Sequence, residues 1–221
     1  MVSTNVSHDA NGNLTDDGTY LYEWNIQNKL SAVRDKATND LIAEYRYDSF
    51  GRRIWKKVYG IKTKEYDYFL SGNQVVQEHQ STATDSVTYN YVYGKYIDEL
   101  ICRYDSTNDY YPIQNRQYST YRVYDGNGSL VEKYRYSPYG EVGFYDPSNN
   151  QLSESSIDMT TLFTGREHDP ETGLYYFRAR MYDAGLGRFI SRDPIGYRDG
   201  YNLYAGYFII LTTDSSGTFC A

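Results

Sequence analysis

Apolar and aromatic residues recur at every second position in several stretches of the chain, which is the pattern of β-strands that bury one face. The stretches with this alternation are Tyr20, Tyr22 and Trp24; Leu41, Ala43, Tyr45 and Tyr47; and Val87, Tyr89, Tyr91 and Tyr93. The clearest hairpin is predicted to join Tyr121–Asp125 to Leu130–Tyr136, because Asn127-Gly128 between them suits a tight type I′ turn. The pattern therefore predicts an all-β fold.

A turn signature repeats loosely along the chain: an aromatic residue or His, usually Asp next, and Gly four residues on. Its copies are His8–Leu14, Tyr47–Arg53, Tyr124–Leu130 and, more loosely, Tyr136–Gly140. The Asp side chain can bond its own downstream backbone, and Gly tolerates positive φ. The irregular interval fits neither propeller blades nor a solenoid of fixed rung length. We expect a curved strip of successive antiparallel β-hairpins that continues in a longer parent chain or closes on itself, because a few hairpins alone bury too little.

Tyrosine changes what the composition implies. Of the 221 residues 40% are hydrophobic, but 28 residues are tyrosine. A tyrosine ring can bury a large apolar area while its hydroxyl stays bonded or wet, so we expect sheets stabilised by aromatic pairs and exclude a helical bundle. The tyrosine stripes have two possible uses: packing between strands, which we favour, and ring stacking on sugars.

The charge balance excludes some partners. A net charge of −7 argues against nucleic-acid binding, which needs a basic face. The pairs Arg52-Arg53 and Lys56-Lys57 are interpreted as the wet face of a strand. The longest apolar stretch, Tyr207–Leu211, is too short to span a bilayer, and no secretory signal is visible at the N-terminus. We therefore expect no nucleic-acid partner and no membrane span.

Cysteine and histidine provide no metal site or cofactor site that the sequence can identify. Cys102 and Cys220 exclude a disulfide scaffold, although one bridge between them and two free thiols both remain open. The three histidines lack metal-ligand spacing. His168-Asp169 resembles half of a catalytic dyad, but no nucleophile motif accompanies it, so we assign His168 to a turn.

The C-terminal third carries the most specific motifs. From Gly173 to Asp183 the chain runs Gly-Leu-Tyr-Tyr-Phe-Arg-Ala-Arg-Met-Tyr-Asp, followed by Gly187-Arg188-Phe189, Asp193-Pro194-Ile195-Gly196 and Asn202-Leu203-Tyr204-Ala205. This order closely resembles the RHS repeat-associated core domain, the C-terminal end of RHS/YD-repeat proteins. The upstream turn repeats extend the resemblance over most of the chain. It implies a hairpin strip wound into a hollow shell that encapsulates a toxic C-terminal polypeptide, with an intramolecular aspartic protease that releases the toxin inside the shell.

The resemblance also implies where the protease residues lie. Asp193 begins the first Asp-Pro-x-Gly motif, Asp214 stands where the second motif should begin, and Arg192 matches an arginine that the family needs. Two close carboxylates can share a proton, so that one acts as base toward water while the other stays protonated. Pro194, Gly196 and Gly217 would shape the two turns. Ser215 replaces the second proline, which weakens the motif or marks a decayed copy.

Simpler interpretations stand beside these assignments. Asp193 and Asp214 could be turn aspartates that cap their own loops. Arg192 could pair with any acidic neighbour. Arg178 and Arg180 are interpreted as a solvated strand face opposite the aromatic residues of the same strand.

The resemblance implies partners, location and domains as well. The expected partners are the protein's own C-terminal toxin polypeptide, upstream repeats of the parent chain and secretion machinery, in a secreted or cell-surface protein. We expect a hairpin strip at 1–145, a flexible Ser/Asn-rich loop at 146–161, the core region at 162–217 and a residual tail at 218–221 without a toxin domain. The alternatives are a non-enzymatic scaffold or a cell-surface or carbohydrate-binding module with a lapsed protease motif, or an orphan core-domain remnant.

Overall fold

The computed structural model describes residues 6–206 and 217, and it consists almost entirely of β-strands. Fifteen strands form one antiparallel sheet in which each strand pairs with its neighbours in chain order. They are β1 (Ser7–His8), β2 (Leu14–Asp16), β3 (Tyr20–Trp24), β4 (Leu30–Asp35), β5 (Leu41–Tyr47), β6 (Arg53–Val58), β7 (Lys64–Ser71), β8 (Gln74–Ser81), β9 (Ser86–Tyr93), β10 (Leu100–Tyr104), β11 (Asp109–Gln114), β12 (Thr120–Asp125), β13 (Leu130–Tyr136), β14 (Val142–Tyr145) and β15 (Gln151–Leu152). The predicted strip of successive hairpins is confirmed.

A second sheet follows in the C-terminal region. Its strands, again in chain order, are β16 (Glu167–Asp169), β17 (Leu174–Phe177), β18 (Arg180–Asp183) and β19 (Arg188–Phe189). The short 3-10 turns η1 (Phe163–Gly165) and η2 (Gly196–Asp199) are the helical elements of the described part. No helix there has the length and apolar character needed to cross a membrane.

The turn between β12 and β13 explains how the repeated signature folds. Gly128 alone has positive φ, at 77°, and its N–H donates to the Asp125 carbonyl at 3.0 Å. The Asp125 carboxylate accepts the N–H of Ser129 at 2.8 Å and that of Asn127 at 2.9 Å. This is a type I turn followed by a left-handed glycine, so the predicted type I′ geometry is wrong. The carboxylate selects the three-residue loop because it satisfies two backbone donors there.

The same geometry occurs at turns that the sequence motif does not mark. Asn25, Asn115 and Asp146 each accept the backbone N–H four residues on, at 2.8–3.0 Å. The left-handed position is filled by Asn28, Tyr118 and Asn149, with φ of 56°, 62° and 70°. The turn therefore depends on the side-chain acceptor at its first position, while glycine at its fourth position is only the least strained choice.

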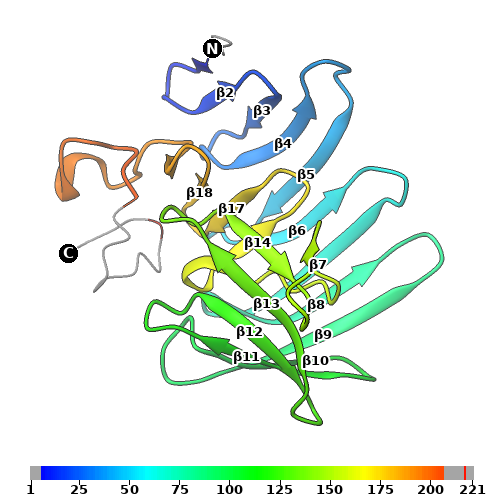
Figure 1. The fold of residues 1–221 in the computed structure, drawn as a ribbon. Helices are drawn as coiled ribbons and strands as arrows, with labels where there is room; N and C mark the ends of the chain where they lie inside the picture. Colours follow the sequence, from blue (N-terminus) through cyan, green and yellow to red (C-terminus); the bar gives the residue numbers. More distant parts are fainter. Residues whose placement is uncertain (1–5, 207–216, 218–221) are drawn as a thin grey trace.

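The strip is curved, and its concave face carries a series of buried tyrosines. Figure 1 shows it passing from β2 at the top through β6–β9 to β10–β13 at the bottom, around β17 and β18. The buried rings belong to Tyr22, Tyr45, Tyr66, Tyr68, Tyr89, Tyr91 and Tyr134. Neighbouring rings stack, as Tyr66 and Tyr68 do with centroids 6.5 Å apart. The burial of these stripes supports packing rather than sugar binding as their use.

The C-terminal region fills the concave face of the strip. One buried cluster joins β12–β14 to β17–β19; it contains Val123, Tyr134, Phe144, Met159, Leu162, Phe163, Tyr175, Phe177, Tyr182, Ala184 and Phe189. A second joins β2–β5 to β17 and β18; it contains Leu14, Tyr22, Leu30, Val33, Ala43, Tyr45, Leu174, Met181 and Ile190. Full burial of one such side chain stabilises a fold by about 1.5–3 kcal/mol. The C-terminal region is thus the core that the strip itself lacks.

The segment 146–161, predicted from its composition to be a flexible loop, is held by buried charges of the strip. Arg103 donates to the carbonyl oxygens of Ile157 at 2.5 Å and Asp158 at 2.7 Å. The Glu132 carboxylate accepts the Ser155 hydroxyl and the Ser156 N–H, both at 2.7 Å. Arg103 and Glu132 are fully buried, so these bonds offset part of the cost of burying their charges.

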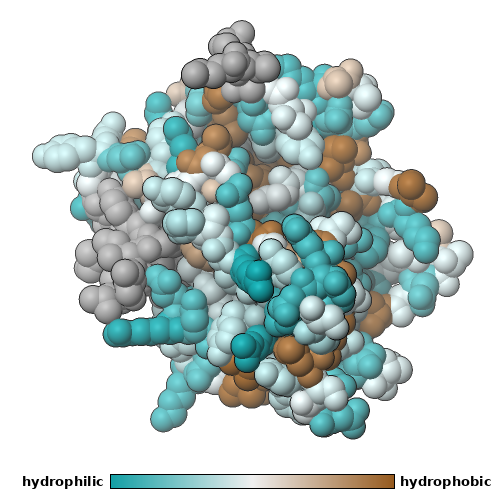
Figure 2. Space-filling view, in the orientation of Figure 1, coloured by the Kyte–Doolittle hydropathy of each residue, from teal (hydrophilic) through white to brown (hydrophobic). Residues whose placement is uncertain are grey.

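The interpretation of Arg53 and Lys56 as part of a wet strand face is wrong. A β-bulge at Ile54 shifts the register between β5 and β6, where Arg46 pairs with Trp55 but Tyr47 pairs with Arg53. The extra residue reverses the alternation, so Arg53 and Lys56 both face the concave side and are buried, while Ile54 is exposed. On the outer surface, Figure 2 shows hydrophilic residues interspersed with small hydrophobic patches.

Candidate active site

Asp193 occupies a tight turn after β19, with its carboxylate directed into the protein. One carboxylate oxygen, Oδ1, accepts the backbone N–H of Ile195 at 2.9 Å, and the N–H of Gly196 donates to the Asp193 carbonyl at 3.1 Å. The other oxygen, Oδ2, forms an ion pair with Arg180 at 2.8 Å. The Asp193 backbone N–H donates to the Leu203 carbonyl at 2.9 Å. Asp193 therefore caps its own turn and also presents a charge to the interior.

Arg180 joins the parts of this site. Its Nε donates to the Gly217 carbonyl at 2.5 Å and its Nη1 to the Leu203 carbonyl at 3.2 Å. The guanidinium lies over the Phe189 ring, 3.6 Å from the centroid. Arg180 is only 3% exposed, so the interpretation of Arg178 and Arg180 as a solvated face is wrong. Arg180, Met181 and Tyr182 are all buried because β18 is covered on both faces, which leaves no wet side.

Gly217 is the described residue of the second predicted motif. Its φ is 72°, and a Cβ added there would lie 2.1 Å from the Phe177 carbonyl oxygen, so only glycine fits. Asp214 lies outside the described residues, three positions before Gly217. Arg180 thus contacts the first aspartate of the predicted pair and the glycine that ends the second motif.

Arg192 points elsewhere in the structure. Its side chain is exposed and lies against the β1–β2 turn, where a Cβ added to Gly12 would be 2.2 Å from Arg192 Nε. Burial lowers the pKa of nearby His8, and the charges of Arg188 and Arg192 lower it further. In the described part of the chain, the ion pair of Asp193 is with Arg180. The sequence motif that contains Arg180 was recognised, but the ion pair between Arg180 and Asp193 could not be predicted from it.

A second buried charge cluster connects the strip to the C-terminal region. Asp169 bonds Arg53 at 2.7 and 3.1 Å and Lys56 at 2.9 Å, while Arg53 also pairs with Glu167 at 2.7 Å. Burial opposes ionisation of Asp169, but Arg53 and Lys56 outweigh it and lower its pKa to about 2. Each charge in the cluster has a partner of opposite charge, so these ion pairs link the two sheets.

His168 lies in strand β16 opposite Tyr175, and its assignment to a turn is wrong. The segment is held in the sheet by pairing with β17, which sequence-local turn signals do not reveal. The imidazole packs against the rings of Tyr175 and Phe144, with centroids 4.8 and 6.2 Å apart. Burial, with a contribution from Lys56, lowers its pKa to about 4, although Asp169 opposes the shift.

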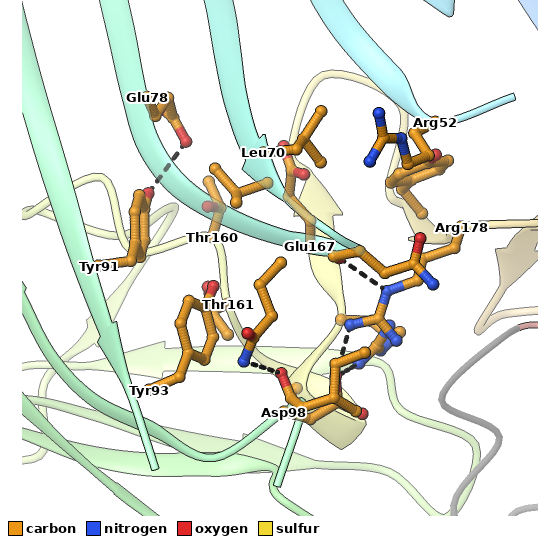
Figure 3. A pocket seen from close by; sticks show the side chains of 17 residues that line it. Arg52, Leu70, Glu78, Tyr91, Tyr93, Asp98, Thr160, Thr161, Glu167 and Arg178 are labelled. Atoms are coloured by element: carbon orange, nitrogen blue, oxygen red, sulfur yellow. Dashed lines mark hydrogen bonds and ion pairs between the residues drawn. The ribbon is translucent and has the colours of Figure 1, made fainter. Parts of the chain in front are cut away.

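A cavity of about 60 Å³ lies between β7–β9 and the C-terminal region. Figure 3 shows Glu78, Glu167, Asp98 and Arg178 around it. Asp98 pairs with Arg178 at 2.8 Å and also with Arg166, and Glu78 accepts the Tyr91 hydroxyl at 2.9 Å. Burial raises the pKa of Glu78, and Glu167 adds to the effect. The ion pairs of Asp98 with Arg166 and Arg178 therefore connect the strip to the C-terminal region at the edge of this cavity.

The described residues contain no group of three or more His, Cys, Asp or Glu side chains arranged to hold a metal ion. Burial raises the pKa of the Cys102 thiol, and Cys220 lies outside the described residues. Among the described residues Cys102 is a free cysteine.

Comparison with known proteins identifies the family. The family described as Teneurin YD-shell matches residues 1–202. The chain is 33% identical over 198 residues to the tRNA nuclease WapA of Bacillus subtilis (strain 168), covering 90% of this chain and 8% of that protein. It is 26% identical over 191 residues to Teneurin-3 of Mus musculus, covering 84% of this chain and 6% of that protein. This chain therefore spans less than a tenth of the length of these relatives.

Solved structures show the same fold. The Tc holotoxin pore of Photorhabdus luminescens matches with a TM-score of 0.76 at 22% identity, covering 97% of this chain and 11% of that chain. The crystal structure of TcdB2-TccC3 without its hypervariable C-terminal region matches with a TM-score of 0.73, covering 97% of this chain and 10% of that chain. The hairpin strip, the C-terminal motifs and these similarities agree, and the chain belongs to the Teneurin YD-shell family of RHS/YD-repeat shell proteins.

Proposed function

We propose that this chain forms the C-terminal end of the wall of a hollow shell in an RHS-type toxin-delivery protein. We further propose that Asp193 and Asp214 form an intramolecular aspartic protease that releases the polypeptide following the core region. The family membership supports the shell role. One structural neighbour was solved without its hypervariable C-terminal region, and a variable C-terminal segment is what such a protease would release.

The observation that carries the protease proposal is the convergence of both motifs on Arg180. Arg180 binds the Asp193 carboxylate and the Gly217 carbonyl, at 2.8 and 2.5 Å. Asp214 is three residues from Gly217, a stretch that spans at most about 10 Å when extended. This arrangement is compatible with a pair of carboxylates close enough to share one proton.

Such a pair would cleave a peptide bond by acid–base catalysis. The ionised carboxylate takes a proton from water while the water oxygen attacks the scissile carbonyl carbon, and the protonated partner donates its proton to the carbonyl oxygen. The C–N bond then breaks, the nitrogen leaves with the proton taken from water, and the second carboxyl regains its own. Arg192 would add positive charge from the solvent side, and Pro194, Gly196 and Gly217 would hold the two turns.

The proposal also covers the wider assembly. The chain's partners would be the polypeptide released, upstream repeats of the parent chain that extend the strip beyond β1, and secretion machinery. The parent protein would act outside the cell that makes it or at that cell's surface. Within the chain, the strip at 1–145 would form the wall, the segment 146–161 would lead into its concave side, and the region 162–217 would fill it and carry the protease.

Fusion of a small inert domain after Ala221 tests the protease. We expect intact-mass spectrometry to show a discrete cut just beyond Gly217. Asp193→Asn and Asp214→Asn should each slow the cut at least about 100-fold, because each removes one of the two acid–base groups. The exposed Asp40→Asn serves as the matched control and should cleave like the parent.

An uncut fusion in a cooperatively folded parent would contradict the protease and leave a non-enzymatic scaffold. Ser215 in place of the second proline is the feature that favours this alternative. Proline presets φ for a turn, so serine there adds conformational freedom to the second motif in the unfolded state.

A further inference from the structure

A second cavity of about 60 Å³ lies between the concave face of the strip and the C-terminal region. Tyr66, Gln80 and His168 line it, and each of these residues is at most 8% exposed. Tyr66 on β7 pairs directly with Gln80 on β8, so their side chains are neighbours on the concave face. His168 comes from β16 of the second sheet. Three strands therefore bring three buried polar side chains to one cavity.

These side chains have hydrogen-bonding positions that the protein does not fill. Within the described part of the chain, no hydrogen bond reaches the Tyr66 hydroxyl or either imidazole nitrogen of His168. Gln80 donates through Nε2 to Glu78 at 2.7 Å, but its carbonyl oxygen Oε1 accepts no hydrogen bond from a described residue. Buried polar groups nearly always have a partner, so three such groups around one cavity indicate a binding site.

The open positions determine what a ligand must offer. Burial, with a contribution from Lys56, lowers the pKa of His168 to about 4 against the opposing effect of Asp169. At neutral pH the imidazole is therefore uncharged, with one donor and one acceptor nitrogen. Gln80 Oε1 can only accept, whereas the Tyr66 hydroxyl can donate or accept. A ligand that satisfies Gln80 and His168 together needs two donor hydrogens and one acceptor.

The charges at the cavity give no preference for an ion. Lys56 Nζ is paired with Asp169 at 2.9 Å, and Lys64 Nζ, which also lines the cavity, is paired with Asp158 at 3.4 Å. Both lysines therefore already have a carboxylate partner, so an anionic ligand would find no unbalanced positive charge on them. A neutral ligand loses less hydration on entering such a site than an ion does.

The size and the walls of the cavity narrow the choice further. One water-sized group needs roughly 10–15 Å³ of such a volume, so the cavity has room for about four non-hydrogen atoms. Phe144 and Met159 provide apolar contacts beside the polar groups. A primary carboxamide on a short carbon chain fits these conditions, because it has two N–H donors, one carbonyl acceptor and an apolar end. A simple alcohol has only one donor.

We propose that this cavity binds a primary carboxamide, either a small free amide or the side chain of Asn or Gln in a polypeptide on the concave side. The NH₂ group donates to Gln80 Oε1 and to the acceptor nitrogen of His168. The carboxamide oxygen accepts the imidazole N–H of His168 and the Tyr66 hydroxyl. The free amide is independent of the proposed protease, whereas the polypeptide source rests on the proposed shell.

Acetamide, which has four non-hydrogen atoms, is the probe for the full chain. Binding is followed by NMR through the imidazole Cε1–H signal of His168, which is assigned by its absence in His168→Phe. We expect a saturable shift with a Kd on the order of 1 mM, as suits so small a ligand. N-acetylasparagine N-methylamide, which has the same group on a peptide backbone, separates the sources. Binding of both probes supports a polypeptide side chain as ligand, and binding of acetamide alone supports a free amide.

Tyr66→Phe removes one hydroxyl and keeps the ring, so we expect acetamide to bind about 3–10-fold more weakly. Tyr89→Phe is the matched control, because Tyr89 is a buried tyrosine on β9 that does not line this cavity. Its affinity for acetamide should equal that of the parent. Equal affinities of folded Tyr66→Phe and the parent would overturn the site.

Two further probes test the chemical class in the parent protein, without any variant. Ethanol lacks the second donor and acetate carries a charge, so we expect both to bind at least about 10-fold more weakly than acetamide. If either binds as tightly as acetamide, the carboxamide class is wrong. A shift that grows linearly up to about 0.1 M acetamide would show that no site exists, since a site of this affinity saturates well below that concentration. None of these measurements depends on cleavage, so an uncut fusion leaves this proposal standing.

Discussion

Replacing Asp169 by Asn is expected to lower the free energy of unfolding by about 3–5 kcal/mol, the usual cost of breaking a buried ion pair from one side. The side chains of Asp169, Arg53 and Lys56 are at most 1% exposed. The substitution keeps the volume but leaves two buried cations with too little opposing charge. Urea denaturation followed by tyrosine and tryptophan fluorescence measures the change.

The matched control is Asp40→Asn, an exposed carboxylate at the β4–β5 turn, for which we expect a change within about 0.5 kcal/mol. The double variant Arg53→Met/Asp169→Asn should be less unstable than the sum of the two single variants, because it removes a cation together with the anion. Equal stability of Asp169→Asn and Asp40→Asn would contradict the claim that the Asp169 ion pairs stabilise the contact between the strip and the C-terminal region.

Acidification from pH 7 to pH 4 is expected to destabilise the protein by about 3 kcal/mol through His168. Its pKa is lowered from 6.5 to about 4 in the folded protein, so between these values the unfolded chain binds the proton and the folded chain does not. The contribution is complete above pH 6.5 and is lost as the pH falls toward 4. Asp169 acts in a lower window, because its pKa falls from 3.8 to about 2 and its contribution is lost below pH 4.

His168→Phe separates these effects in urea denaturation at a series of pH values. Phenylalanine keeps the contacts with Phe144 and Tyr175 but cannot take up a proton. We expect the slope of stability between pH 6.5 and 4 to flatten in this variant while the loss below pH 4 remains. An unchanged slope between pH 6.5 and 4 would show that groups other than His168 cause it.

Local patterns in the sequence predicted the strip well, because its contacts are local. Each strand pairs with its neighbours in the chain, so alternation and turn chemistry determine most of the architecture. The wrong predictions come from single residues that interrupt the alternation of a strand or change the type of a turn. The bulge at Ile54 turns Arg53 and Lys56 inward, and no rule of simple alternation predicts it. The turn at Asp125 is type I rather than the predicted type I′, because the Asp125 carboxylate accepts two backbone N–H groups.

The C-terminal region was harder to predict because both of its faces are covered. Arg180 and His168 looked like a surface residue and a turn residue when only the neighbouring sequence was considered. Their burial follows from the packing of β16–β19 against the concave face of the strip. The motifs located Asp193 in a turn correctly, yet its ion-pair partner could be identified only once Arg180 had been placed in space.

The central claim is that Asp193 and Asp214 together cut the polypeptide that follows them, and intact-mass spectrometry of the fusion after Ala221 tests it most directly. We expect a discrete cut just beyond Gly217 in the parent, slowed at least about 100-fold in Asp193→Asn and in Asp214→Asn. An uncut fusion in a cooperatively folded parent would contradict the account.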